Sequence, residues 1–179
     1  MSAYDLARIQ REIADLPKPS TNTTTKGKKL QNLVHYMLDG VDGATVVRSN
    51  VYNAAQSEEK DLWFRHRPYV SGLPFADFLV PVECKNEDEP VSADEITRFE
   101  AKIRNSGGSD GLLVARGGLA GTSEFRAAHE AIHSALSRQI RIVVITVDDL
   151  TRTLSPDAFV DLLVDRHTEL RVLQTYRSI

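Results

Sequence analysis

The sequence predicts an α/β protein with a mixed β-sheet flanked by helices and a helical arm at the N-terminus. From residue 74 onward, short apolar runs alternate with helical patterns in the order strand, helix, strand, helix, strand. That alternation is typical of a parallel βαβαβ unit. Before it, the β-branched run 44–52 and the period-two run 58–66 predict two strands of an antiparallel meander.

The N-terminal part of the chain predicts two helices separated by a linker. Apolar residues spaced three and four apart predict a first helix over 3–16. The stretch 17–27 contains two prolines followed by polar β-branched residues, which predicts the linker. A second helical pattern covers 28–38. We therefore expect an N-terminal helix and linker over 1–25 and a main domain over 26–179, with the first helix packed on that domain or on a second subunit.

The second half of the chain carries the strongest strand and capping signals. Residues 74–85 are apolar on both faces, which predicts a central strand. Because Pro81 cannot donate a hydrogen bond to a neighbouring strand, we expect a bulge or a locally unpaired position there. Ser92, followed three residues later by Glu95, predicts a capping box at a helix start. The remaining expected elements are a helix over 93–105, a strand over 111–118, a helix over 123–137, a strand over 140–150 and a helix over 155–165.

Composition limits the possible function and location. The 179 residues have a net charge of −3, which argues against a protein that coats nucleic acid by bulk charge but leaves room for a locally basic groove. A single cysteine, Cys84, excludes an intramolecular disulfide and is typical of a reducing compartment, so we expect a cytoplasmic protein. No apolar run approaches about 18 residues, and the first residues lack a signal-peptide pattern, so no membrane association is expected.

Two charged residues stand at the end of the expected central strand. Glu83 and Lys85 share one face, roughly 6.5–7 Å apart along the strand. Cys84 faces the other way, into the core with Val80 and Val82. Charges at the end of an apolar run are costly to desolvate unless they are paired or bind a ligand. The pattern therefore indicates either a structural ion pair or a functional site.

Asp61 is the carboxylate most suited to join Glu83. It lies on the preceding expected strand, and a hairpin between the two strands would bring both carboxylates together near Lys85. Such oxygen donors suit a hard cation such as Mg²⁺. The alternative for Asp61 is a solvated charge run. Asp77 has the same parity as Glu83, but along a strand it would lie roughly 20 Å away and is not expected to share a metal.

These residues resemble the PD-(D/E)xK nuclease superfamily, which has a restriction-endonuclease-like core. Asp61, followed by Glu83, Cys84 and Lys85 at the end of an apolar strand, carries the resemblance. The ordered set Lys26-Gly27, EEKD, VECKNEDEPVSADEITRFEAKI and GLLVARGGL is similar to Mrr-like and related defence nucleases and covers 26–150. The resemblance implies a metal-dependent endonuclease that cleaves double-stranded DNA in restriction or anti-phage defence, as a homodimer or a larger assembly.

The resemblance also implies roles for individual residues. Asp61, Glu83 and the backbone carbonyl of Cys84 would hold Mg²⁺ or Mn²⁺, and Lys85 would position or activate the attacking water. Cleavage would leave a 5′-phosphate and a 3′-hydroxyl. Gln31 stands where many members carry a glutamate, which implies a supporting role with one metal or weaker metal affinity. Apart from the resemblance, basic residues at a helix start, after Asp61 and at a strand end are candidates for contact with the nucleic-acid backbone, and the alternative for each is ordinary solvated surface charge; they are Lys26, Lys28, Lys29, Arg65, Arg67 and Arg116.

A second motif predicts a different chemistry. His129-Glu130-Ala131-Ile132-His133 is an H-E-x-x-H sequence on an expected helix, the spacing with which zinc metallopeptidases hold zinc. A third ligand would have to come from Asp148, Asp149 or His167, and no pattern singles one out. The alternative for both histidines is the surface of an outer helix. A third possibility is a catalytically inactive, nuclease-like module that binds nucleic acid or protein.

Overall fold

A computed structural model describes residues 3–16, 23–49, 62–119 and 123–174. The strands are β1 (Ala44–Ser49), β2 (Leu62–His66), β3 (Leu79–Lys85), β4 (Asp110–Ala115) and β5 (Arg141–Thr146). The helices are α1 (Leu6–Asp15), α2 (Thr23–Asp39), α3 (Pro68–Ser71), α4 (Ala93–Asn105), α5 (Ser123–Ser137), α6 (Val147–Thr151) and α7 (Pro156–Leu173). Among these helices, none combines the length and the apolarity needed to span a lipid bilayer.

The strands form one mixed sheet in the order β1-β2-β3-β4-β5. β1, β2 and β3 pair antiparallel, whereas β3, β4 and β5 pair parallel through the crossover helices α4 and α5. The predicted meander and βαβαβ unit are therefore both confirmed. In the described part of the sheet, the pairing of β3 with β2 reaches Val82, opposite Leu62, and the residues from Glu83 to Lys85 pair with β4, Glu83 opposite Leu113.

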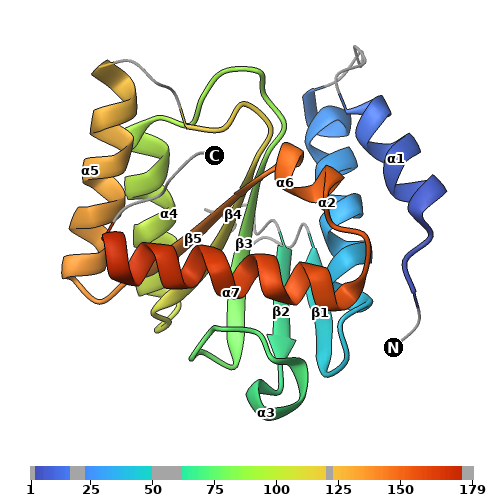
Figure 1. The fold of residues 1–179 in the computed structure, drawn as a ribbon. Helices are drawn as coiled ribbons and strands as arrows, with labels where there is room; N and C mark the ends of the chain where they lie inside the picture. The colour runs from blue at the N-terminus through green and yellow to red at the C-terminus, as the bar shows by residue number, and fades with distance from the viewer. Residues whose placement is uncertain (1–2, 17–22, 50–61, 120–122, 175–179) are drawn as a thin grey trace.

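Each face of the sheet has its own apolar core. Helices α1, α2, α6 and α7 cover one face, and α4 and α5 pack on the other (Figure 1). Val80, Val82 and Cys84 are buried on the first face, as their alternation along β3 predicts. The N-terminal helix packs on α2 of the same chain, where the Tyr4 hydroxyl donates a 2.7 Å hydrogen bond to the Met37 carbonyl.

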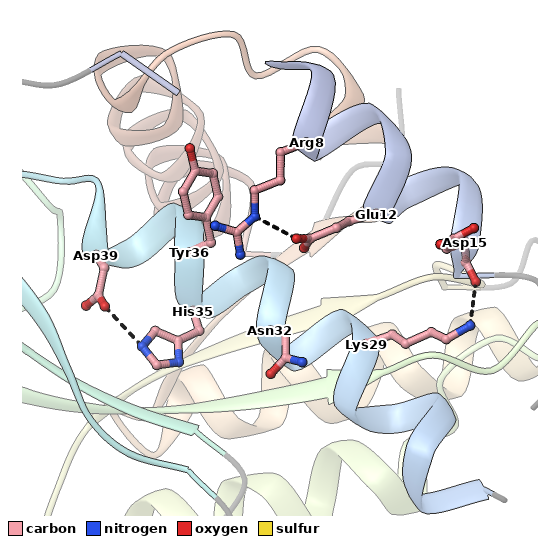
Figure 2. Close-up of a pocket in the computed structure, with 8 residues that line it drawn as sticks. All are labelled: Arg8, Glu12, Asp15, Lys29, Asn32, His35, Tyr36 and Asp39. Carbon is pink, nitrogen blue, oxygen red and sulfur yellow. Dashed lines mark hydrogen bonds and ion pairs between the residues drawn. The ribbon is translucent and has the colours of Figure 1, made fainter. Parts of the chain in front are cut away.

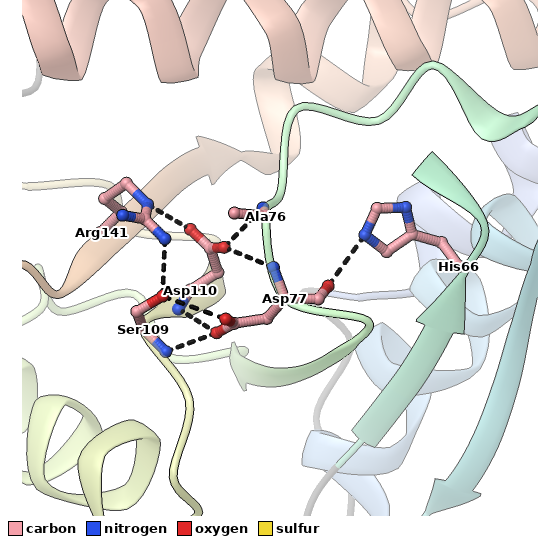
Figure 3. Close-up of polar contacts among 6 residues, drawn as sticks. All are labelled: His66, Ala76, Asp77, Ser109, Asp110 and Arg141. Carbon is pink, nitrogen blue, oxygen red and sulfur yellow. Dashed lines mark hydrogen bonds and ion pairs between the residues drawn. The ribbon is translucent and has the colours of Figure 1, made fainter. Parts of the chain in front are cut away.

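The central strand begins later than the sequence predicts. β3 starts at Leu79 rather than at residue 74, and the short helix α3 was not expected. The cause is Asp110, whose carboxylate accepts hydrogen bonds from the N–H groups of Ala76 at 2.7 Å and Asp77 at 2.9 Å (Figure 3). These backbone donors therefore bond to a side chain instead of a neighbouring strand. Asp77 therefore lies outside the strand, and the distance of roughly 20 Å to Glu83 that an extended strand predicts does not apply.

Of the two alternatives expected at Pro81, the bulge does not form, and the position is instead unpaired on the side of β4. It pairs with Trp63, and the β2–β3 register runs through this position without a shift. β4 pairs with β3 only from Val82 onward, so the missing N–H of the proline lies outside that ladder. In the described part of the sheet, the register shift lies instead between β1 and β2, at Val46/Arg48.

The boundaries of two helices and one strand also differ from the prediction. α2 begins at Thr23, inside the expected linker. β5 ends at Thr146, whose side chain forms a capping box with Asp149 and starts α6 where a longer strand was expected. α7 continues to Leu173 instead of ending at 165. Its buried Arg166 pairs with Asp149 at 2.8 Å, so a charged residue stands where a helical apolar pattern would place an apolar one.

The helix that follows β3 forms as predicted. Ser92 and Glu95 make the reciprocal capping box of α4, and Ile96, Phe99 and Ile103 are buried. α4 lies close to β4 because Gly111 has no side chain. A Cβ atom there would come within 2.5 Å of the Ile103 Cδ1 atom and 2.9 Å of the Phe99 Cζ atom. This close approach sets the position of α4 beside the end of β3.

Candidate active site

Glu83 and Lys85 lie side by side at the end of β3. The Lys85 Nζ atom is 3.6 Å from the Glu83 Oε1 atom, and both side chains are partly buried. The prediction that they share one face of the strand is confirmed. Two charges are thus held together at the end of a strand whose alternate residues lie in the core.

Helix α4 contributes two more charges to the same place. Lys85 Nζ is 3.0 Å from Glu95 Oε1, and Lys102 Nζ is 3.1 Å from Glu83 Oε2. The order of contact is Lys102, Glu83, Lys85, Glu95, so opposite charges alternate. We call these residues the four-charge cluster.

Glu95 belongs to both the helix cap and the cluster. Its Oε2 atom accepts hydrogen bonds from the Ser92 N–H at 2.9 Å and the Ser92 hydroxyl at 3.0 Å, which leaves Oε1 facing Lys85. Burial alone would raise the pKa of Glu95. The bonds from Ser92 and Lys85 outweigh burial and lower this pKa below its usual value. The carboxylate therefore remains charged at neutral pH.

Lys85 is held in its charged form. Burial alone would lower its pKa, but the hydrogen bond to Glu95 and the negative charges of Glu83, Glu95 and Glu87 outweigh burial. The pKa of Lys85 is therefore raised above its usual value. An ammonium group of this kind donates hydrogen bonds and balances negative charge.

The cluster borders a pocket of about 500 Å³. Its lining residues are Glu83, Lys85, Glu95, Arg98, Phe99, Ala101 and Lys102. Three cationic side chains and two carboxylates thus surround one opening. Cations suit a phosphate group and carboxylates suit a metal ion, so the pocket offers donors for both.

Sequence reasoning missed the contribution of α4 to the site. Glu95 was assigned only to the capping box, and neither Arg98 nor Lys102 was singled out. The three residues are spaced three and four apart, which puts them on one face of the helix. This polar stripe on a crossover helix next to Glu83 and Lys85 was the signal available in the sequence.

The predicted metal ligands are described only in part. Asp61 lies outside the described residues, so its place beside Glu83 stays a prediction. Cys84 is buried. The backbone carbonyl of the next residue, Lys85, accepts a 2.8 Å hydrogen bond from the backbone N–H of Arg116. Gln31 is 8% exposed on α2 and is not among the described residues that line the pocket.

The predicted nucleic-acid contacts lie in different parts of the molecule. Arg65 pairs with Leu79, four residues before Glu83, so it lies roughly 13 Å along the sheet from the site. Arg67 lies further along, and both side chains are exposed. Arg116 forms an ion pair with Asp88. Contact of these side chains with nucleic acid stays a prediction.

The lysines predicted to contact nucleic acid lie on α2. Lys28 is exposed, while the side chain of Lys26 lies outside the described part. Lys29 donates a 3.0 Å hydrogen bond to the backbone carbonyl of Asp15 and lines a pocket of about 520 Å³ between α1 and α2. Figure 2 shows the ion pair Arg8–Glu12 and the hydrogen bond between His35 and Asp39 in this pocket, at 2.7 Å and 3.0 Å. Much of its charge is thus paired internally.

The H-E-x-x-H motif lies on α5. His133 is exposed, whereas His129 is partly buried, and burial lowers the pKa of His129. Over the ranges that the structure describes, no three His, Cys, Asp or Glu side chains are grouped closely enough to hold a metal ion. The third zinc ligand that a metallopeptidase needs is therefore missing from the described residues.

The fold is similar to that of NucC from P. aeruginosa ATCC27853, solved in its cAAA-bound form. The TM-score is 0.52 at 14% sequence identity, over 97% of this chain and 90% of the NucC chain. The fold is restriction-endonuclease-like. This confirms the predicted class of mixed sheet and flanking helices. No family model matches the chain, and no curated protein does.

Within this restriction-endonuclease-like fold, the four-charge cluster has a defined place. It lies where the antiparallel hairpin meets the parallel strands, at the end of β3 and beside the first crossover helix. Glu83 and Lys85 come from the strand, and Glu95 and Lys102 come from the helix. The fold thus brings residues up to 19 positions apart in sequence into direct contact.

Proposed function

We propose that this chain is a metal-dependent nuclease that hydrolyses phosphodiester bonds of double-stranded DNA, of the Mrr-like kind and acting in restriction or anti-phage defence. The observation that carries the proposal is the pairing of Glu83 with Lys85 at the end of the central strand, facing a pocket that also contains Lys102 and Arg98. Likeness of fold to NucC and resemblance to the PD-(D/E)xK superfamily both support it.

The donor atoms suit Mg²⁺ or Mn²⁺. Glu83 offers a partly buried carboxylate, and hard divalent cations prefer oxygen ligands. In our proposal, Glu83, the Cys84 backbone carbonyl and Asp61 hold the ion. Asp61 is included because it precedes Leu62, which pairs with the residue before Glu83. When bound, a divalent ion supplies Lewis-acid polarisation of the phosphate and makes water a better nucleophile.

The cationic side chains act on the phosphate. Lys85 donates hydrogen bonds to the attacking water and to a non-bridging oxygen, while Lys102 and Arg98 draw the anionic backbone into the pocket. Attack of water on phosphorus forms one P–O bond and breaks the P–O3′ bond. The products carry a 5′-phosphate and a 3′-hydroxyl, and a proton from water passes to the leaving oxygen.

Plasmid cleavage tests this proposal. We expect supercoiled DNA to be nicked or linearised with Mg²⁺ or Mn²⁺ and to be protected by EDTA. Because NucC is described with cAAA bound, the assay is run with and without cAAA. Glu83→Gln, Lys85→Ala and Asp61→Asn should each reduce the rate at least about 100-fold, as expected when a group that stabilises the transition state is removed.

Glu130→Gln is the matched control, because Glu130 is an exposed glutamate on α5. It should cleave at the parental rate, and His133→Ala should do the same. If Glu83→Gln and Lys85→Ala also cleave like the parent, the assignment of the site is wrong. DNA binding by the parent without cleavage of DNA or RNA would instead identify an inactive binding module. Light scattering of the purified chain tests the proposed homodimer or larger assembly.

A further inference from the structure

Helix α4 and strand β3 pair their charges crosswise. Glu95 and Lys102 are seven residues apart on α4 and share one helix face. Lys85 and Glu83 are two residues apart on β3. Glu95, the earlier residue of the helix, pairs with Lys85, the later residue of the strand. Lys102 pairs with Glu83.

The oxygen atoms of the two carboxylates are divided between partners. Glu83 directs Oε1 toward Lys85 at 3.6 Å and Oε2 toward Lys102 at 3.1 Å. Glu95 directs Oε2 into the cap of α4 and Oε1 toward Lys85 at 3.0 Å. Lys85 is therefore closer to Glu95 than to Glu83. Because Ser92 fixes Glu95, the helix cap holds the ammonium of Lys85 nearer to Glu95 than to Glu83.

A divalent cation that binds Glu83 has to compete with two ammonium groups. Lys102 opposes the cation directly, because it lies on one oxygen of Glu83. Glu95 has the opposite effect, because it holds Lys85 at 3.0 Å while the other oxygen of Glu83 lies 3.6 Å from the same ammonium. The side chains of Glu83 and Lys102 are only 19% and 14% exposed, so solvent screens this pair incompletely.

We propose that Glu95 and Lys102 are positioning residues that set the affinity of Glu83 for a divalent cation in opposite directions. Lys102 weakens binding of the cation and Glu95 strengthens it. This inference rests on the proposed function, since it takes Glu83 as a metal ligand. In this inference α4 belongs to the site, because its side chains set the affinity of Glu83 for the cation.

Calorimetric titration of the full chain with Mn²⁺, without nucleic acid, tests the inference. Lys102→Met removes a competing charge and should lower the Kd for Mn²⁺ about three- to tenfold. Lys102→Arg keeps the charge and should leave the Kd near the parental value. Glu95→Gln keeps a capping-box side chain but loses its charge, so it should raise the Kd by a similar factor. Opposite shifts are a signature that loss of structure does not produce.

Glu100→Gln is the control on the same helix. Glu100 pairs with Arg138 at 2.6 Å, away from the four-charge cluster, and its variant should bind Mn²⁺ like the parent. If Lys102→Met and Glu95→Gln shift the Kd in the same direction, or not at all, while Glu83→Gln abolishes binding, the inference is overturned and the proposed metal site stands. If Mn²⁺ binding by the parent is undetectable or survives Glu83→Gln, the metal site and the inference are both overturned.

Discussion

Asp110 and Asp77 fix the loop that leads into the central strand. Asp110 is fully buried and accepts hydrogen bonds from the N–H groups of Ala76 and Asp77 and from the Arg141 Nε atom at 2.6 Å. Asp77 in turn accepts hydrogen bonds from the N–H groups of Ser109 and Asp110 (Figure 3). The carboxylate of each aspartate thus accepts a hydrogen bond from the backbone N–H of the other. Their position defines where β3 begins, and β3 carries Glu83.

Asp110→Asn should therefore be strongly destabilising. The amide replaces one accepting oxygen by a donor that faces N–H groups, and it leaves Arg141 without its charged partner. Removal of one member of a buried ion pair costs about 3–5 kcal/mol, and because Arg141 is 21% exposed we expect about 2–3 kcal/mol. Urea denaturation measures the loss. Asp148→Asn, at an exposed position on α6, should change stability by less than about 0.5 kcal/mol. Equal effects of both substitutions would contradict this account of the loop.

The residues of the candidate site were predictable to different degrees. Glu83 and Lys85 were found because neighbours two apart on a strand share a face, which is a local rule. Lys102 was not found, because its contact with Glu83 depends on where α4 lies on the sheet. Glu95 was found only in its capping role, which is local and which the structure confirms, whereas its bond to Lys85 is not local. Asp61 was proposed from sequence alone and remains a prediction.

At the scale of elements, the close approach of α4 to β4 positions half of the site. A Cβ atom at Gly111 would lie 2.5 Å from Ile103 Cδ1, so the helix would have to move. Gly111→Ala should lower the free energy of unfolding by about 1–3 kcal/mol, as overpacked cores do. Urea denaturation measures this change.

A second substitution checks the cause. Ile103→Val removes the Cδ1 atom that the new methyl group would meet first. The double variant Gly111→Ala/Ile103→Val should recover part of the loss, so the two effects are not additive. Purely additive losses would show that Gly111 is required for some reason other than its contact with α4.

Elements were predictable where a local signal marks their ends. The Ser92–Glu95 capping box located the start of α4, and periodicity located α5. The end of β5 was missed because Val147 and Leu150 continue the apolar run, while the turn into α6 depends on Thr146 capping that helix. α7 was cut short because buried Arg166 is stabilised by Asp149, 17 residues earlier. Pairing over such separations leaves no local pattern to read.

At the scale of the whole molecule, three histidines are kept neutral by burial. Burial lowers the pKa of His66, His129 and His167. The folded state therefore favours the uncharged imidazole at each of these positions. His66 is fully buried: its Nε2 atom lies 2.9 Å from the Asp77 carbonyl, and its Nδ1 atom lies 3.0 Å from the Ser71 hydroxyl. Since a carbonyl only accepts, Nε2 carries the proton and Nδ1 accepts from Ser71. A second proton on this ring would reverse the bond to Ser71, because Nδ1 would then donate to the hydroxyl oxygen.

Stability should therefore fall as the solution becomes mildly acidic. The unfolded chain binds protons at its histidines near the ordinary pKa of 6.5, and the folded chain does so only at lower pH. The histidine contribution is thus complete above pH 6.5 and is lost as the pH falls below it. Each histidine adds a slope of at most about 1.4 kcal/mol per pH unit.

Urea denaturation between pH 5.5 and 8 measures the slope of the unfolding free energy against pH. His66→Gln keeps a donor for the Asp77 carbonyl but cannot titrate, so it should flatten the slope even though it lowers stability at pH 8. A parental slope in His66→Gln would show that another group controls the acid sensitivity of the fold.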